Sequence, residues 1–74
     1  LVADDPMSYK ERGDAYYGLG LYQKAIDDYD KAIQFEPNYA EAYDSRGAAY
    51  DELGQDAKAD ADKAKACSLD KQYC

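Results

Sequence analysis

The chain has 74 residues, of which 16 are Asp or Glu and nine are Lys or Arg, so its formal net charge is −7. This length allows one small domain with a modest core. The acidic balance disfavours nucleic acid and anionic membrane surfaces, which both need clustered Lys or Arg, and it permits a basic partner. Histidine, the commonest general base and metal ligand, is absent.

The chain begins with Leu1, so we expect a fragment or a processed product, with residues 1–5 as an N-terminal tail. No apolar run approaches the roughly 20 residues that cross a bilayer, and we expect a soluble chain. The sequence does not fix a compartment, although a cytoplasmic location is favoured.

Local signals predict four helices and no strand. The first begins after Asp5-Pro6, a good N-cap followed by a proline suited to the first turn, and is stopped by Gly20. The second covers roughly 22–35, with an apolar stripe at helical spacing, and ends before Pro37. The third is expected to be capped by Asn38, with Glu41 as its capping-box partner, and to run to residue 53. The fourth covers roughly 56–69.

The two halves of the chain repeat each other. When the sequence is shifted by thirty-four residues, thirteen positions are identical, including the Arg-Gly pairs at 12–13 and 46–47. A fixed period of this size is typical of stacked supersecondary units. Glycine inside a helix costs about 1 kcal/mol relative to alanine, so Gly13 and Gly47 at one register predict a close crossing of two helices within each unit.

The repeated residues resemble the signature of the tetratricopeptide repeat (TPR) family. The first copy supplies Tyr9, Arg12, Gly13, Tyr16, Ala25, Tyr29, Ala32 and Pro37, and the second supplies Tyr43, Arg46, Gly47, Tyr50, Ala59 and Ala66. The resemblance implies an all-α fold, an α-α superhelix of four antiparallel helices in two helix-turn-helix units. The units would cover residues 6–39 and 40–73. A catalytic role is not expected.

The sequence departs from the family pattern in three ways, and these departures predict features of the two arginines and of the last helix. Arg replaces the usual leucine in both copies, so its stem is expected to pack while its guanidinium reaches an acid. Lys63 replaces the aromatic of the fourth helix, and Asp60 replaces the Ile26 of the first copy. The last helix is therefore polar, which suggests either a terminal cap that keeps a repeat array soluble or a frayed segment.

Cys67 and Cys74 are seven residues apart. On an unbroken helix they would be about 10.5 Å apart, too far for a disulfide. A bridge requires the helix to end near Leu69 and the chain to turn back, and we expect free thiols instead. A bridge would argue for an oxidising compartment.

No cofactor or metal is predicted. The acids at 27, 28 and 30 are interpreted as a solvated helix face, and those at 56, 60 and 62 lack the glycine and distal glutamate of a calcium loop. The segment Gly18-Leu19-Gly20 lacks the lysine and strand of a phosphate loop.

In TPR proteins the first helix of each pair lines a concave groove that holds peptides or partner helices. When the positions are carried over by register, the resemblance implies that this groove is acidic and binds a peptide. Its residues would be Lys10, Asp14, Tyr17, Glu41, Asp44, Ser45, Ala48 and Asp51. One TPR subtype clamps a terminal carboxylate with lysines and asparagines. Lys10 matches that pattern, but Asp14 and Ser45 stand where asparagines belong, and Asp14 would repel a carboxylate.

The resemblance thus implies a non-catalytic protein–protein interaction module that binds a basic or neutral peptide. The alternative is a structural scaffold, or a fragment of a longer array, that self-associates by stacking end to end. An ordinary solvated helix face also remains open for the groove residues.

Overall fold

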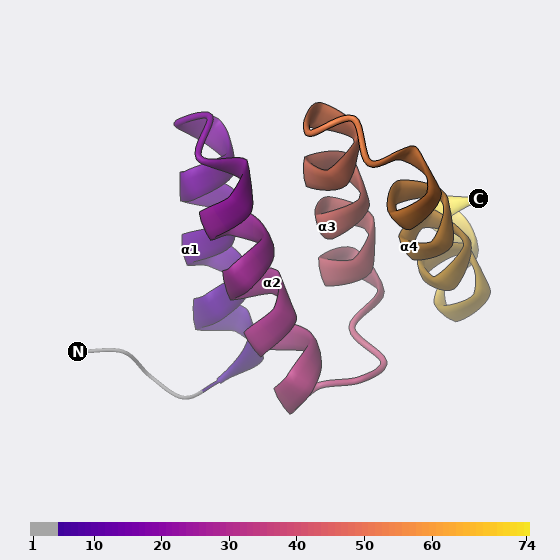
Figure 1. Cartoon of the computed structure of the whole chain (residues 1–74). Helices are drawn as coiled ribbons and strands as arrows, with labels where there is room; N and C mark the ends of the chain where they lie inside the picture. Colours follow the sequence, from indigo (N-terminus) through magenta and orange to yellow (C-terminus); the bar gives the residue numbers. More distant parts are fainter. Residues whose placement is uncertain (1–4) are drawn as a thin grey trace.

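The computed structural model describes residues 5–74 and contains four α-helices followed by a short 3-10 helix. These are α1 (Pro6–Gly18), α2 (Tyr22–Phe35), α3 (Ala40–Glu52), α4 (Asp56–Leu69) and η1 (Lys71–Tyr73). Consecutive helices are antiparallel, so α1 and α2 form a first hairpin and α3 and α4 a second one beside it (Figure 1). The all-α prediction is confirmed. Of the predicted tail, residues 1–4 lie outside the described residues.

Capping residues begin and end the helices largely as predicted. The Asp5 side chain accepts a hydrogen bond from the backbone N–H of Ser8 at 2.8 Å and caps α1. Gly20 and Gly54 follow α1 and α3 with φ angles of 78° and 74°, in the left-handed region that glycine enters without strain. Both turns are closed in the same way, since Leu21 N–H donates to the Tyr16 carbonyl at 2.9 Å and the second hairpin repeats this bond.

The predicted cap of α3 is wrong. The N-cap residue is Tyr39, which makes no side-chain capping bond, and α3 begins one residue later at Ala40. Asn38 lies in the preceding turn, where its N–H donates to the Glu36 side chain at 3.3 Å. The Glu41 carboxylate is drawn away from the helix terminus because it pairs with Lys10 of α1 at 3.0 Å.

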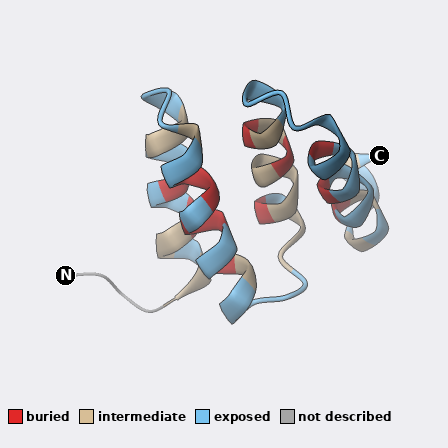
Figure 2. Ribbon diagram, in the orientation of Figure 1, coloured by how far each residue is buried: buried red, intermediate tan, exposed pale blue. Residues whose placement is uncertain are grey.

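The core consists of small residues around two large side chains. Ile26 and Tyr29 of α2 are the largest fully buried side chains, and the other buried apolar residues are alanines (Figure 2). The close crossing expected at Gly13 and Gly47 is present. A Cβ atom on Gly13 would lie 2.7 Å from Cε1 of Tyr29, and one on Gly47 would lie 3.1 Å from the Ala59 carbonyl oxygen.

Each hairpin is also held by an arginine that spans its two helices. Nε and Nη2 of Arg12 donate to the two carboxylate oxygens of Asp28 at 2.8 and 2.7 Å. Arg46 holds Asp62 in the same fork at 2.7 Å for both bonds. Asp28 and Asp62 are buried, and the two-bond geometry compensates their charge. The predicted role of both arginines is confirmed.

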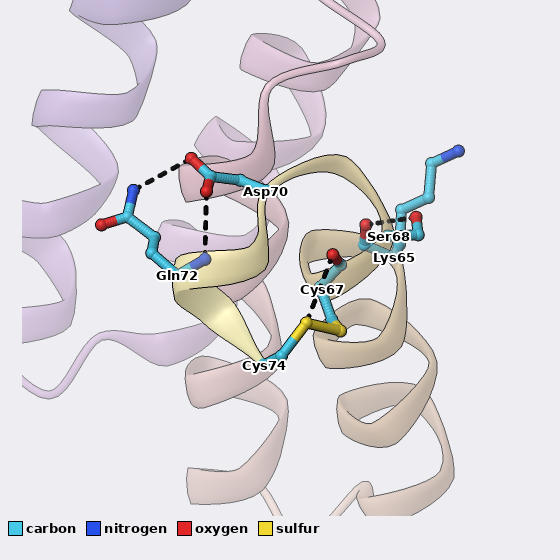
Figure 3. Close-up of a disulfide and its surroundings, with 6 residues drawn as sticks. All are labelled: Lys65, Cys67, Ser68, Asp70, Gln72 and Cys74. Carbon is cyan, nitrogen blue, oxygen red and sulfur yellow. Dashed lines mark hydrogen bonds between the residues drawn. A yellow bond between two sulfur atoms is a disulfide. The ribbon is translucent and has the colours of Figure 1, made fainter.

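The structure contradicts the expectation of free thiols, because Cys67 and Cys74 form a disulfide (Figure 3). Helix α4 ends at Leu69, and the chain then turns back through η1, which brings the two Cα atoms to 4.7 Å. Asp70 stabilises the turn, since its Oδ1 accepts from the N–H of Gln72 at 3.0 Å. Spacing along an unbroken helix was the wrong reference because the helix stops between the two cysteines.

Helix α4 is continuous but polar, with Ala59, Asp62 and Ala66 as its buried residues. At the positions where α2 buries Ile26 and Tyr29, α4 carries the exposed residues Asp60 and Lys63. Within the described part of the chain, no helix is long and apolar enough to cross a membrane.

Candidate functional site: a hollow between α1 and α3

The first helices of the two hairpins enclose a hollow of about 260 Å³. We call it the central hollow and define it by its lining residues: Asp14, Tyr17, Tyr29, Asp44, Ser45 and Ala48. Two of these residues come from α1, three from α3 and one from α2. The hollow therefore exists only because the two hairpins pack side by side.

A partly buried polar network holds the wall of the hollow on the α1 side. The hydroxyl of Tyr29 donates to Oδ1 of Asp14 at 2.6 Å, and Nζ of Lys10 donates to Oδ2 of the same carboxylate at 2.7 Å. Lys10 also pairs with Glu41 of α3 at 3.0 Å, so one buried ammonium joins α1 to α3. Such charge-assisted bonds fix the carboxylate in one orientation.

The surroundings of the network change the pKa of its two proton donors, Tyr29 and Lys10. Burial, followed by the hydrogen bond to Asp14, raises the pKa of Tyr29 well above its usual range. Burial alone would lower the pKa of Lys10, but the hydrogen bonds to Asp14 and Glu41 outweigh it and the pKa is raised. Tyr29 is therefore neutral and Lys10 charged at neutral pH, and the network is intact there.

The opposite wall offers a carboxylate that the protein has not neutralised. Asp44 is half-buried and has no ion-pair partner among residues 5–74. Tyr17 of α1 lines the same hollow with a partly buried ring, which packs edge-to-face on Tyr22 with a centroid separation of 5.3 Å. Burial, then the charge of Glu52, raises the pKa of Tyr17. The hollow thus combines an aromatic surface with an unpaired negative charge.

Five of the eight predicted site residues line the central hollow, namely Asp14, Tyr17, Asp44, Ser45 and Ala48. The other three lie beside it in ion pairs. Lys10 and Glu41 pair with each other, and Asp51 pairs with Lys63 of α4. The Lys10 ammonium is enclosed by two carboxylates and is not displayed as a free cation.

Sequence reasoning missed the contribution of Tyr29 to the site. It was interpreted only as a core aromatic of α2, yet it lines the hollow and orients Asp14. A usable signal existed, because the hydroxyl of a buried tyrosine usually finds a hydrogen-bond partner. Asp14 lies on the neighbouring helix, at the position where the family clamp has asparagine.

The described residues contain no candidate metal-binding site. No three His, Cys, Asp or Glu side chains of residues 5–74 lie close enough together to hold a metal ion. What the hollow offers is a surface of hydroxyls, an aromatic ring and carboxylates, which suits recognition of a polar or cationic side chain.

Comparison with known proteins agrees with this architecture. Residues 4–54 match a family described as TPR repeat, and residues 40–73 match one described as Tetratricopeptide repeat. Over 66 residues the chain is 38% identical to DnaJ homolog subfamily C member 7 of Mus musculus and 35% identical to that of Homo sapiens. These alignments cover 89% of this chain but only 13% of either relative.

Solved structures give the same result. MamA superposes with a TM-score of 0.90 at 31% identity, over 92% of this chain and 40% of that one. The first TPR of Spaghetti (RPAP3), bound to the HSP90 peptide SRMEEVD, superposes with a TM-score of 0.89 at 32% identity, over 92% of this chain and 54% of that one. The chain therefore belongs to the tetratricopeptide repeat family and contains two of its helical hairpins.

Proposed function

We propose that the chain is a non-catalytic module that binds a basic or neutral peptide segment of a partner protein in the central hollow. The observation that carries the proposal is the unpaired, half-buried carboxylate of Asp44 opposite the ring of Tyr17. A lysine or arginine of the peptide would lay its aliphatic stem on Tyr17 and Ala48 and direct its cation to Asp44.

The comparisons support binding of a peptide but not its charge. The RPAP3 relative binds SRMEEVD, which carries three acidic residues and one basic residue. In this chain Asp14 and Asp44 line the central hollow, and its lining residues include no cation. Potentials across an interface are usually complementary, so a segment richer in Lys or Arg is the better partner.

The test uses two peptides of equal length and opposite sign of net charge: SRMEEVD, and SRMKKVK, in which lysine replaces the three acidic residues. Each is labelled with a fluorophore and titrated with the chain at low salt, and the binding is followed by fluorescence anisotropy. We expect SRMKKVK to bind more tightly, and its affinity to fall as salt screens the attraction. Equal affinity for both peptides would overturn the charge assignment, and absence of binding to either would overturn the module's proposed role.

A matched pair of variants locates the site. Asp44→Asn removes the unpaired charge of the hollow, whereas Asp27→Asn removes an equal charge from α2, outside the hollow lining. Loss of a partly exposed pair worth about 1 kcal/mol weakens binding about five-fold. We expect this loss for Asp44→Asn and an unchanged affinity for Asp27→Asn; equal losses would mean that only net charge matters.

A further inference from the structure

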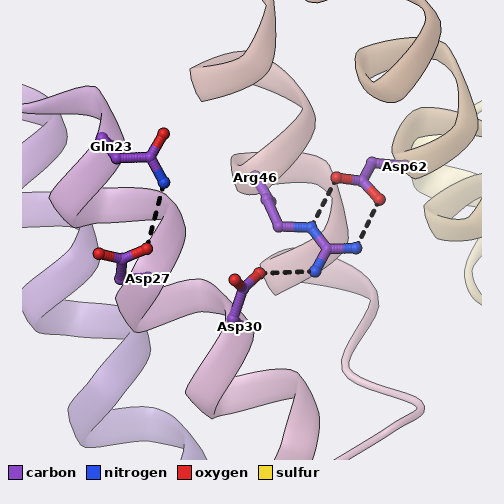
Figure 4. Close-up of polar contacts among 5 residues, drawn as sticks. All are labelled: Gln23, Asp27, Asp30, Arg46 and Asp62. Atoms are coloured by element: carbon purple, nitrogen blue, oxygen red, sulfur yellow. Dashed lines mark hydrogen bonds and ion pairs between the residues drawn. The ribbon is translucent and has the colours of Figure 1, made fainter.

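The two hairpins contact each other along two lines of different character. Helices α2 and α3 pack directly, since Ile26 and Ala49 share one core cluster and Nη1 of Arg46 donates to Asp30 at 2.8 Å (Figure 4). Helices α1 and α3 instead enclose the central hollow between them. The width and charge of the hollow therefore depend on the side chains that reach from one of these two helices to the other.

Two side-chain bridges join α1 to α3. Nζ of Lys10 pairs with Oε2 of Glu41 at 3.0 Å, and the hydroxyl of Tyr17 donates to Oε2 of Glu52 at 3.3 Å. Because α1 and α3 run parallel, the first bridge lies before the lining segments of both helices and the second lies at their C-terminal end. Each bridge uses a glutamate of α3, but only Glu41 holds a cation.

The cation that Glu41 holds is bonded directly to the lining of the hollow. Nζ of Lys10 also pairs with Oδ2 of Asp14 at 2.7 Å, and Asp14 is a lining residue. The Lys10 side chain is only 11% exposed, whereas that of Glu41 is 53% exposed. Asp14 is fixed a second time by the hydroxyl of Tyr29. Glu41 is thus the more exposed of the two carboxylates that enclose the ammonium.

A carboxylate of a ligand would displace Glu41 from Lys10 only with difficulty. Glu41 belongs to the same folded chain, so it competes at an effective concentration on the order of millimolar. It also lies in the first turn of α3, where the partial positive charge of the helix N-terminus favours an acid. An acidic peptide at micromolar concentration therefore meets an ammonium that is already occupied.

We propose that Glu41 is a specificity-determining residue of the central hollow. As an internal ligand of Lys10, it excludes acidic side chains of a partner peptide and leaves the hollow to cationic ones. The role rests on the proposed function, because it concerns the choice of peptide by the same hollow. With Glu41 in place, the group of Lys10, Asp14 and Glu41 carries one net negative charge; without it, the group is neutral and two N–H donors of the ammonium are free.

The test compares Glu41→Ala with the matched control Glu52→Ala. Each variant removes one negative charge and one bridge between α1 and α3, but only Glu41→Ala uncovers a cation. Both are titrated with labelled SRMEEVD and SRMKKVK in the anisotropy assay. Glu41→Ala should bind SRMEEVD about five-fold more tightly than the parent chain does, and Glu52→Ala should gain less than about two-fold.

Two further comparisons separate selection from a merely structural role. If Glu41 served only to hold the hairpins together, its removal would weaken binding of both peptides, so a gain for SRMEEVD alone identifies selection. Lys10→Gln added to Glu41→Ala should abolish the gain, because the amide can still donate to Asp14 but carries no charge.

An unchanged or weaker affinity of Glu41→Ala for SRMEEVD would overturn the proposal. An equal gain in Glu52→Ala would overturn it as well, since net charge alone would then explain the result, and so would a gain that survives Lys10→Gln. The proposed function is judged by binding of SRMKKVK to the parent chain, and the role of Glu41 by binding of SRMEEVD to the variants, so each can fail without the other.

Discussion

Alanine at the two buried glycines should affect the hairpins unequally, although the glycines occupy the same register. On Gly13 a Cβ atom would lie 2.7 and 3.0 Å from two carbons of the Tyr29 ring. On Gly47 the contacts are looser, 3.1 Å to the Ala59 carbonyl oxygen and 3.2 Å to Cγ of Lys63. The ring of Tyr29 is 1% exposed and cannot move aside, whereas Lys63 is an exposed, flexible side chain.

The magnitudes follow from two opposing terms. Alanine gains about 1 kcal/mol over glycine in a helix interior, and overpacking a filled core costs about 1–3 kcal/mol. At Gly13 the overpacking is near the upper end, so Gly13→Ala should lower the free energy of unfolding by about 1–2 kcal/mol. At Gly47 the two terms nearly cancel, and Gly47→Ala should change the stability by less than about 0.5 kcal/mol.

Thermal and urea unfolding, followed by circular dichroism, measures both variants against the parent. A loss of 1 kcal/mol lowers the Tm of a domain of this size by about 4–8 °C, so Gly13→Ala should melt clearly below Gly47→Ala. Equal melting temperatures, or a less stable Gly47→Ala, would refute the claim that the Tyr29 ring sets the tightness of the first crossing.

Three further outcomes are expected. The pKa of Tyr29 is raised in the folded state, so the unfolded chain loses this proton first as pH rises. The free energy of unfolding should therefore fall above about pH 10, by about 1.4 kcal/mol per pH unit for this tyrosine. A free energy of unfolding that stays flat from pH 9 to 11 would contradict the network, and Tyr29→Phe is the control. Reducing the Cys67–Cys74 disulfide should cost about 2.4 kcal/mol for a loop this short and increase amide exchange in η1 while α1–α3 stay protected. A thiol titration of the unfolded, unreduced chain should find no free thiol. The double variant Asp60→Ile, Ala64→Asp places on α4 the isoleucine and aspartate that α2 presents to α3 as Ile26 and Asp30. This variant should self-associate as its concentration rises, which sedimentation measures. A strictly monomeric variant would contradict the importance of these two residues for the contact between hairpins.

The repeat made most of the fold predictable. Gly13 and Gly47 indicated the crossings, and Gly20 and Gly54 the helix ends, because each of these residues acts within one hairpin. The paired arginines indicated an acidic partner but not its burial, since Asp28 was interpreted as part of a solvated helix face and is in fact buried. Errors arose where a second element decides the outcome. Glu41 was assigned to a capping box, but it pairs with Lys10, a partner that only the assembled hairpins bring near.

The positions of the candidate site residues follow in part from the sequence. Asp44, Ser45 and Ala48 share one helical face of α3, and that face lines the hollow. The pairing of Asp51 with Lys63 was not predictable, because Lys63 replaces an aromatic and the pattern does not say which acid a flexible lysine reaches. The disulfide was not predicted for a related reason, because the distance between the two cysteines depends on where α4 ends.

The central claim is that a cationic side chain of the partner enters the hollow between α1 and α3. Intermolecular nuclear Overhauser effects in the complex of the chain with SRMKKVK test it most directly. We expect cross-peaks from lysine methylene protons of the peptide to the ring of Tyr17 and the methyl group of Ala48. Cross-peaks to side chains of α4 or to the outer face of α2, with none to Tyr17 and Ala48, would contradict it.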